Sequence, residues 1–108
     1  MFFSKFSIGP ASDFYRLTAD GYTGNASDGL AAHSNMQFTT KDSDHDLNAS
    51  KNCAILYEGA WWHRSCYNSH LNGLYAVANS SGVRWWLLEE PKSAMLLKFT
   101  EMKFREKI

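Results

Sequence analysis

The sequence predicts an α+β fold in which antiparallel strands near both ends flank a loop-rich centre. Apolar, β-prone runs occur near the two ends, while Phe38–Tyr75 has little periodicity and contains both cysteines, an acidic run and an Asn-Gly turn signal. With 108 residues, of which 44% are hydrophobic and 15% aromatic, the chain can form one small core.

The N-terminal part is expected to contain an antiparallel strand pair. Phe2–Ile8 alternates loosely and stops at Gly9-Pro10, as a strand entering a turn does. Phe14–Ala19 alternates better and precedes the turn signal Asp20-Gly21. These two runs are therefore predicted to pair.

A helical turn and two further strands are expected beyond this pair. Asp28 can cap a short helical turn over Gly29–His33. Val83–Leu88 and Ala94–Phe104 are apolar and β-prone, and Glu89-Glu90-Pro91 separates them. We expect Ala94–Phe104 to pair with the N-terminal strands.

The charge balance excludes some classes of partner. Eleven basic and eleven acidic residues give no electrostatic footprint for a nucleic-acid partner. No apolar run approaches the roughly 20 residues of a membrane-spanning helix, so we expect no membrane span. The opening MFFSKFSIGP lacks the apolar run and cleavage site of a signal peptide.

An acidic loop is a candidate calcium site. Asp42, Asp44 and Asp46 alternate and place hard oxygen ligands on one loop. An EF-hand is excluded, because Leu47 and Cys53 stand where it needs Gly and Glu. A solvated acidic turn without an ion is the alternative.

Cys53 and Cys66 are compatible by count with a reduced pair or with one disulfide. A C-x2-C zinc spacing is missing, and we favour the disulfide, whose loop of about 13 residues would contribute roughly 3 kcal/mol. A disulfide indicates an oxidising, extracellular setting. Glycosylation sequons at Asn25, Asn48 and Asn79 agree weakly with that setting.

Several motifs occur in a characteristic order. They are FTT-x-D-x-D-x-D, N-C-A, G-A-W-W, a second Cys and L-N-G-x-Y. This order resembles the fibrinogen-related domain of fibrinogen chains, ficolins, tachylectins, tenascins and angiopoietins. The similarity extends through Phe6–Gly24, Asp28–Gln37, Gly82–Trp85 and Lys98–Arg105.

The resemblance implies a partial fibrinogen C-terminal-like fold over residues 1–108. It implies the C-terminal half of the domain, whose N-terminal half would precede Met1. Residues 1–37 and 82–108 would belong mainly to the central sheet. Residues 38–81 would carry the calcium site and the ligand pocket.

The resemblance also implies a set of calcium ligands. These are the side chains of Asp44 and Asp46 and the main-chain carbonyls of Asn48 and Ser50. The chain carries an additional residue between Asp46 and Cys53 compared with the fibrinogen γ chain, so a neighbour of Ser50 is an alternative source of the second carbonyl.

The ligand pocket implied by the resemblance surrounds the second cysteine. Ser65–Cys66 would be a cis peptide within a Cys53–Cys66 disulfide loop. The N–H groups of Cys66 and Tyr67 would bind the oxygen of an acetyl group, and Tyr57 would form an apolar wall.

Departures from the lectin pattern concern the pocket walls. Tyr67 stands where sugar-binding members commonly have His, and Tyr75–Gly82 is shorter than usual and lacks the aromatic that closes the pocket. Trp85 or Trp86 is a candidate replacement, although we expect core packing for both, as we do for Trp61-Trp62. The four histidines, at positions 33, 45, 63 and 70, are expected on the surface or in loops.

Two functions of different class follow. The first is a secreted, calcium-dependent, lectin-like module that binds acetylated sugars or amines in innate recognition. The second is a protein-interaction or truncated fibrinogen-like module without sugar binding. An enzyme is not expected, because no nucleophile elbow or raised-pKa carboxylate pair is recognisable. Self-association into a homo-oligomer is compatible with either function.

Overall fold

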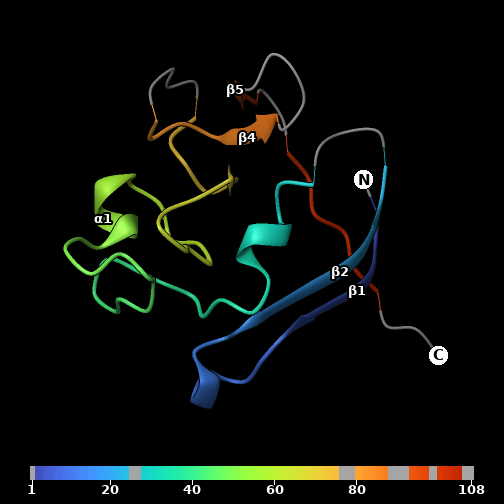
Figure 1. Ribbon diagram of the computed structural model, residues 1–108, viewed down its shortest axis with the longest axis horizontal. Coiled ribbons are helices and arrows are strands. Elements are labelled where there is room, and N and C mark those ends of the chain that lie inside the picture. Colours follow the sequence, from blue (N-terminus) through green and yellow to red (C-terminus); the bar gives the residue numbers. More distant parts are fainter. Residues whose placement is uncertain (1, 25–27, 76–79, 88–92, 98–99, 106–108) are drawn as a thin grey trace.

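The computed structural model describes residues 2–24, 28–75, 80–87, 93–97 and 100–105, and it is of the predicted α+β class (Figure 1). A two-stranded sheet and a three-stranded sheet are connected by short helices and a long, mostly irregular segment, residues 38–75, which is called the irregular segment below. The elements are β1 (Phe2–Ile8), η1 (Ala11–Asp13), β2 (Leu17–Thr23), η2 (Ala31–His33), α1 (Cys53–Leu56), β3 (Ser69–His70), β4 (Arg84–Leu87) and β5 (Ser93–Leu96).

β1 and β2 form an antiparallel ribbon whose register runs from Phe2 opposite Thr23 to Ile8 opposite Leu17. The predicted pairing is confirmed, as is the predicted turn after Gly9-Pro10, but the turn predicted at Asp20-Gly21 is wrong. The chain reverses earlier, at η1, where the Pro10 carbonyl accepts the N–H groups of Asp13 and Tyr15 at 3.0 and 3.1 Å.

The second strand therefore begins later than predicted. Phe14 and Tyr15 have φ values of 50° and 56°, which end the 3-10 turn and exclude them from the strand. Asp20 and Gly21 lie inside β2, where Gly21 adopts a φ of 66°. A glycine tolerates this positive φ within the strand, and the chain does not form a hairpin turn here.

The predicted helical turn after β2 is confirmed as the short 3-10 helix η2. Asp28 Oδ1 accepts the N–H groups of Leu30 and Ala31, each at 3.1 Å. Gly29 lies flat against the indole of Trp85, where a Cβ atom would approach Cε2 to 2.6 Å. The capped turn therefore packs directly on β4.

The C-terminal strands form a second sheet in the order β3-β4-β5. β4 confirms the predicted strand over Val83–Leu88, but the predicted partner of Ala94–Phe104 is wrong. β5 pairs with β4, with Trp86 opposite Ala94. A partner close in sequence needs only a short loop, so closing this hairpin costs less entropy than reaching the N-terminal ribbon.

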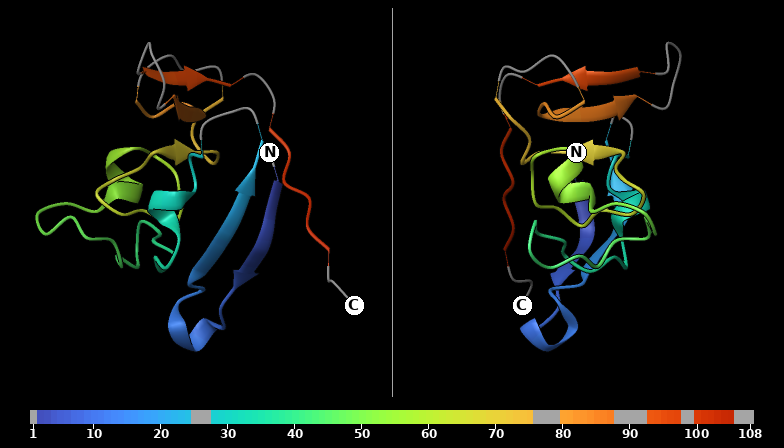
Figure 2. Two further views of the ribbon diagram at one scale, coloured as in Figure 1. Left: turned by 45° about the vertical axis from the view of Figure 1, so that its right-hand side comes forward. Right: turned by 90° about the vertical axis from the view of Figure 1, so that its left-hand side faces the viewer.

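Residues 100–105 run beside β1 without forming a strand (Figures 1 and 2). The contact is through side chains, since Phe104 stacks on Phe6 with ring centroids 6.0 Å apart. The end of the chain therefore does return to the ribbon, but it adds no hydrogen-bonded strand within the described residues.

One apolar cluster joins the two sheets to the irregular segment. Trp61 is 1% exposed, and Trp62 and Trp85 are also buried. The structural roles expected for these three tryptophans are thus confirmed, while the Trp86 side chain lies outside the described part. The cluster comprises Leu17, Ala19, Leu30, Met36, Trp61, Trp62 and Trp85.

Candidate functional site

The irregular segment is held to the core by main-chain hydrogen bonds. Thr39 N–H donates to the Trp61 carbonyl at 2.9 Å, and Trp61 N–H donates to the Thr39 carbonyl at 3.2 Å. Asn52 caps α1, because its Oδ1 accepts Ala54 N–H at 2.8 Å. Its Nδ2 donates to the Thr40 carbonyl at 2.9 Å, which ties the start of the acidic loop to this helix.

Asp46 is the central residue of the acidic loop. One carboxylate oxygen accepts Asn48 N–H and the other accepts Cys53 N–H, both at 2.9 Å. Asp44 accepts Asp46 N–H at 3.2 Å. Asp42 instead accepts the Thr40 hydroxyl at 2.7 Å, which lowers the pKa of Asp42. Asp44 and Asp46 therefore share one turn, as predicted, and Asp42 faces elsewhere.

The same loop has main-chain oxygens free to bind a cation. Asn48 Oδ1 accepts Ser50 N–H and Ser50 O–H, both at 3.1 Å. This turns the Asn48 side chain into the loop, and no described residue donates to the main-chain carbonyls of Asn48 or Ser50. Two carboxylates with two carbonyls suit calcium, which accepts both kinds of oxygen and water.

A cage made of side chains alone is absent from the described residues. No three His, Cys, Asp or Glu side chains within them come together as a metal site. An ion at this loop would therefore depend on main-chain carbonyls and water to complete its shell.

The predicted disulfide between Cys53 and Cys66 is present, and Cys53 is the first residue of α1. The Ser65–Cys66 peptide is cis. Cys53 N–H donates to Asp46, so Cys53 contacts the acidic loop and is also bonded to the loop that contains Cys66. Leu47 N–H donates to the Arg64 carbonyl at 2.7 Å and joins the same two loops a second time.

Two tyrosines lie side by side next to this cysteine. The rings of Tyr57 and Tyr67 meet edge to face, with centroids 5.2 Å apart. Tyr67 O–H donates to the Ser80 carbonyl at 2.6 Å, and burial raises the pKa of Tyr67. No described residue accepts the N–H group of Cys66 or Tyr67. The structure therefore brings Tyr57, Cys66 and Tyr67 together, and Ser65 is exposed beside them.

The histidines were expected on the surface or in loops, which is wrong for His33 in η2 and His70 in β3, while His63 lies in a loop but is buried. His33, His63 and His70 are fully buried. Only His45 is partly exposed, and its ring stacks on Phe14 at 3.9 Å. His63 follows two buried tryptophans directly, and this is the one signal in the sequence that could have indicated burial.

His33 positions the segment that carries Tyr67. Its Nδ1 lies 2.8 Å from the Trp62 carbonyl, while its Nε2 accepts the N–H groups of Asn68 and Ser69 at 2.9 and 3.2 Å. These contacts require a neutral ring with the proton on Nδ1. Burial lowers the pKa of His33 to about 4, so the ring remains neutral near pH 7.

His63 and His70 lie below the tyrosine pair. His63 Nε2 lies 2.8 Å from the Gly59 carbonyl, and the two imidazole rings are 5.4 Å apart. His70 stacks on Tyr67 at 4.9 Å. Burial lowers the pKa of both histidines, which favours their uncharged rings.

The chain matches the family described as the C-terminal globular domain of fibrinogen beta and gamma chains over residues 1–107. It belongs to this family. The chain is 45% identical over 106 residues to Fibrinogen C domain-containing protein 1-A of Xenopus laevis, covering 93% of this chain and 22% of that protein. It is 37% identical over 105 residues to Tenascin-R of Gallus gallus, covering 96% of this chain and 8% of that protein.

Solved fibrinogen-like domains share the fold. The fibrinogen-like globe domain of human ANGPTL2 has a TM-score of 0.72 at 34% identity, covering 85% of this chain and 45% of that one. Lamprey fibrin D-dimer, complexed with the peptide Gly-His-Arg-Pro-amide, has a TM-score of 0.57 at 30% identity, covering 74% and 33%. This fibrinogen-related chain thus spans less than half of these solved domains. No helix in its described part is long and apolar enough to cross a membrane.

Proposed function

We propose that this fibrinogen-related chain is a secreted, calcium-dependent recognition module that binds acetylated sugars or amines. The observation that carries the proposal is the pair of unpartnered N–H groups, of Cys66 and Tyr67, beside the contacting rings of Tyr57 and Tyr67. The extracellular disulfide and the fibrinogen-related family agree with a recognition role outside the cell. An enzymatic reaction is not part of the proposal.

An acetyl group matches this arrangement chemically. Its carbonyl oxygen accepts the N–H groups of Cys66 and Tyr67, and its methyl packs against the ring of Tyr57. Ser65 is exposed at the rim, where it contacts the remainder of the ligand. Neutral donors and one small apolar wall bury little surface, so the affinity of a single site should be weak, about millimolar.

Calcium would be held by Asp44, Asp46 and the main-chain carbonyls of Asn48 and Ser50. The ion would supply positive charge that offsets the repulsion between the two carboxylates. Asp46 accepts Cys53 N–H, and Cys53 is bonded to Cys66. An acidic loop that is ordered by calcium would therefore also fix the positions of the two amide donors.

Retention on N-acetylglucosamine resin, with and without chelator, tests the proposal. Wild-type protein should be retained only with calcium, and Tyr57→Ala should abolish retention because the apolar wall is lost. Ile55→Ala is a matched control, since Ile55 lies in α1, which Tyr57 caps, and is 60% exposed. Folded wild-type protein that flows through the resin at millimolar calcium would contradict the proposal.

A protein-interaction role is the second candidate. It is favoured by the exposed aromatic residues on β1 and in residues 100–105, and by the lamprey relative that was solved with a peptide ligand. The sequence of Tyr75–Gly82 is also shorter than in lectin members of the family and lacks the aromatic residue that closes their pocket. Retention of folded protein on an immobilised protein partner but never on acetylated resin would support this second role.

A further inference from the structure

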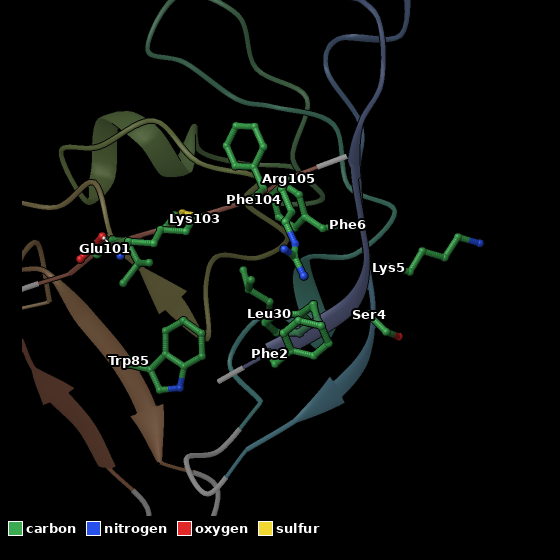
Figure 3. A pocket seen from close by; sticks show the side chains of 13 residues that line it. Phe2, Ser4, Lys5, Phe6, Leu30, Trp85, Glu101, Lys103, Phe104 and Arg105 are labelled. Carbon is green, nitrogen blue, oxygen red and sulfur yellow. Dashed lines mark ion pairs between the residues drawn. The ribbon is translucent and has the colours of Figure 1, made fainter. Parts of the chain in front are cut away.

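The two ends of the β1–β2 ribbon have different surroundings. Beside residues 2–6, near the start of β1, an open groove of about 660 Å³ separates the strand from residues 101–105 (Figure 3). At the opposite end, beyond Ile8, the chain reverses at η1 and contacts the acidic loop. This second end therefore joins the ribbon to the candidate calcium site.

The contact is made by Phe14, whose ring stacks on the imidazole of His45. The two ring centroids are 3.9 Å apart, and the ring planes are inclined by 27°. Stacked aromatic rings attract each other beyond the effect of the apolar area that they bury. His45 stands between Asp44 and Asp46 in the sequence, so Phe14 contacts the acidic loop between its two candidate carboxylate ligands.

The backbone of Phe14 is fixed on both sides of its Cα atom. Phe14 N–H donates to the Ala11 carbonyl at 3.0 Å, and the Phe14 carbonyl accepts Phe38 N–H at 2.8 Å. The φ of Phe14 is 50°, in the left-handed region that a residue other than glycine rarely adopts unless its surroundings hold it there. The ring is therefore presented to the acidic loop by a backbone of defined position.

His45 is also held by bonds within its own loop. Its N–H donates to Thr39 Oγ1 at 3.0 Å, and its Nε2 lies 2.7 Å from Ser43 Oγ. Thr39 is fully buried and pairs with Trp61, so the bond from His45 N–H reaches the core. These bonds fix the main chain and one edge of the imidazole, whereas Phe14 contacts its face.

The position of His45 limits where both carboxylates can lie. Consecutive Cα atoms are about 3.8 Å apart, so a displacement of His45 also displaces Asp44 and Asp46. Calcium binds its oxygen ligands at roughly 2.3–2.6 Å. Ligands that are already held near such positions lose less conformational entropy when the ion binds, and the affinity is correspondingly higher.

We propose that Phe14 is a positioning residue for the calcium site, which rests on the proposed binding of calcium by Asp44 and Asp46. By stacking on His45, Phe14 holds the acidic loop in the form that binds the ion. Phe14 is 45% exposed, so truncating its side chain removes little buried apolar surface. A purely structural role therefore predicts a small loss of stability and an unchanged affinity for calcium.

Calorimetric titration of calcium into the full chain tests this role. Phe14→Ala should raise the dissociation constant for calcium about three- to tenfold, the effect expected of one aromatic pair. Phe14→Tyr keeps a ring at this position and should restore the wild-type affinity, whereas Phe14→Leu should not. Tyr15→Ala is the matched control, because Tyr15 lies in the same corner, has a φ of 56° and is 50% exposed.

Two further measurements show whether Phe14 acts through His45. His45→Ala should weaken calcium binding at least as much as Phe14→Ala, and combining the two substitutions should cause no further loss. Amide hydrogen exchange provides a readout without calcium. The His45 amide, which donates to Thr39, should exchange faster in Phe14→Ala than in the wild type, and at the wild-type rate in Tyr15→Ala.

The possible failures are distinguishable. Unchanged calcium affinity in folded Phe14→Ala or Phe14→Leu, or effects of Phe14→Ala and His45→Ala that multiply in the double variant, would overturn the positioning role and leave calcium binding in place. Equal losses in Phe14→Ala and Tyr15→Ala would overturn it as well, because they would indicate general disruption of the corner. A wild-type chain that binds no calcium would overturn both this role and the calcium part of the proposed function.

Discussion

The irregular segment of residues 38–75 and the β1–β2 ribbon represent opposite ways of stabilising a chain. The segment has little regular structure, yet it includes Trp61 at 1% exposure, a disulfide and fully buried histidines. The ribbon has a regular ladder, yet Phe2 on it is 57% exposed. Regular hydrogen bonding and burial are thus separate properties, and burial decides where side-chain truncation is most costly.

The difference has a functional consequence. In the irregular segment the chain around the unpartnered N–H groups of Cys66 and Tyr67 is fixed by its neighbours, since Leu47 N–H donates to the Arg64 carbonyl at 2.7 Å and Arg64 N–H donates to the Cys66 carbonyl at 2.8 Å. On the ribbon, unpaired groups simply belong to an edge. The predictions below test this contrast in order of decreasing effect.

Trp61→Ala should have the largest effect on stability. Removing a fully buried tryptophan typically costs about 3–5 kcal/mol, because a cavity remains. Phe2→Ala, at an exposed position of β1, should cost less than about 1 kcal/mol. Urea unfolding of both variants measures the contrast, and equal losses would show that the ribbon is as well packed as the segment.

Replacing both Cys53 and Cys66 by Ser should cost about 3 kcal/mol, the entropy of a loop of this length. The variant should also lose retention on acetylated resin, because Cys66 is no longer joined to α1. Thermal unfolding combined with resin binding checks both effects. Full retention by the folded double variant would separate the disulfide from ligand recognition.

Acid should weaken the irregular segment through His33. Its folded pKa of about 4 lies below the ordinary value of 6.5, so the unfolded chain binds the proton more readily. The contribution of His33 to the free energy of unfolding is therefore complete above pH 6.5. It declines by up to about 3 kcal/mol as the pH falls toward 4. Unfolding measured across this range should show a smaller slope for His33→Gln, and an unchanged slope would contradict this role.

Phe104→Ala should have the smallest effect, within about 0.5 kcal/mol, because the side chain is 77% exposed. The free energy of unfolding in urea tests this. A loss above about 2 kcal/mol would mean that residues 100–105 are part of the core.

Local patterns predicted the strands and the pairing of β1 with β2, but not the partner of β5. The apolar runs indicated β1 and β4, and Asp28 indicated η2, because alternation and capping depend on nearby residues. Gly9-Pro10 indicated the turn that precedes η1, whereas Asp20-Gly21 carries a turn signal but lies inside β2. The pairing of β5 with β4 depends on the whole topology, which short-range periodicity does not contain.

The candidate site, like the fold, could be predicted only in part. The cysteine count, the missing zinc spacing and the resemblance to fibrinogen-related domains indicated the Cys53–Cys66 disulfide, and the resemblance alone implied that Tyr57 and Tyr67 lie near each other. The burial of His33 and His70 could not be predicted, because no apolar period marks them, whereas His63 directly follows Trp61-Trp62. Their role is visible only when Trp62 and Asn68 are brought to His33 in space.

An NMR titration with N-acetylglucosamine against glucosamine, at saturating calcium, tests the proposed recognition most directly. The two sugars differ in the acetyl group, so only the first can accept the amide protons of Cys66 and Tyr67. We expect shifts of these two amide resonances with N-acetylglucosamine alone, at about millimolar concentrations. Unchanged Cys66 and Tyr67 resonances, or equal shifts with both sugars, would contradict acetyl recognition at this site.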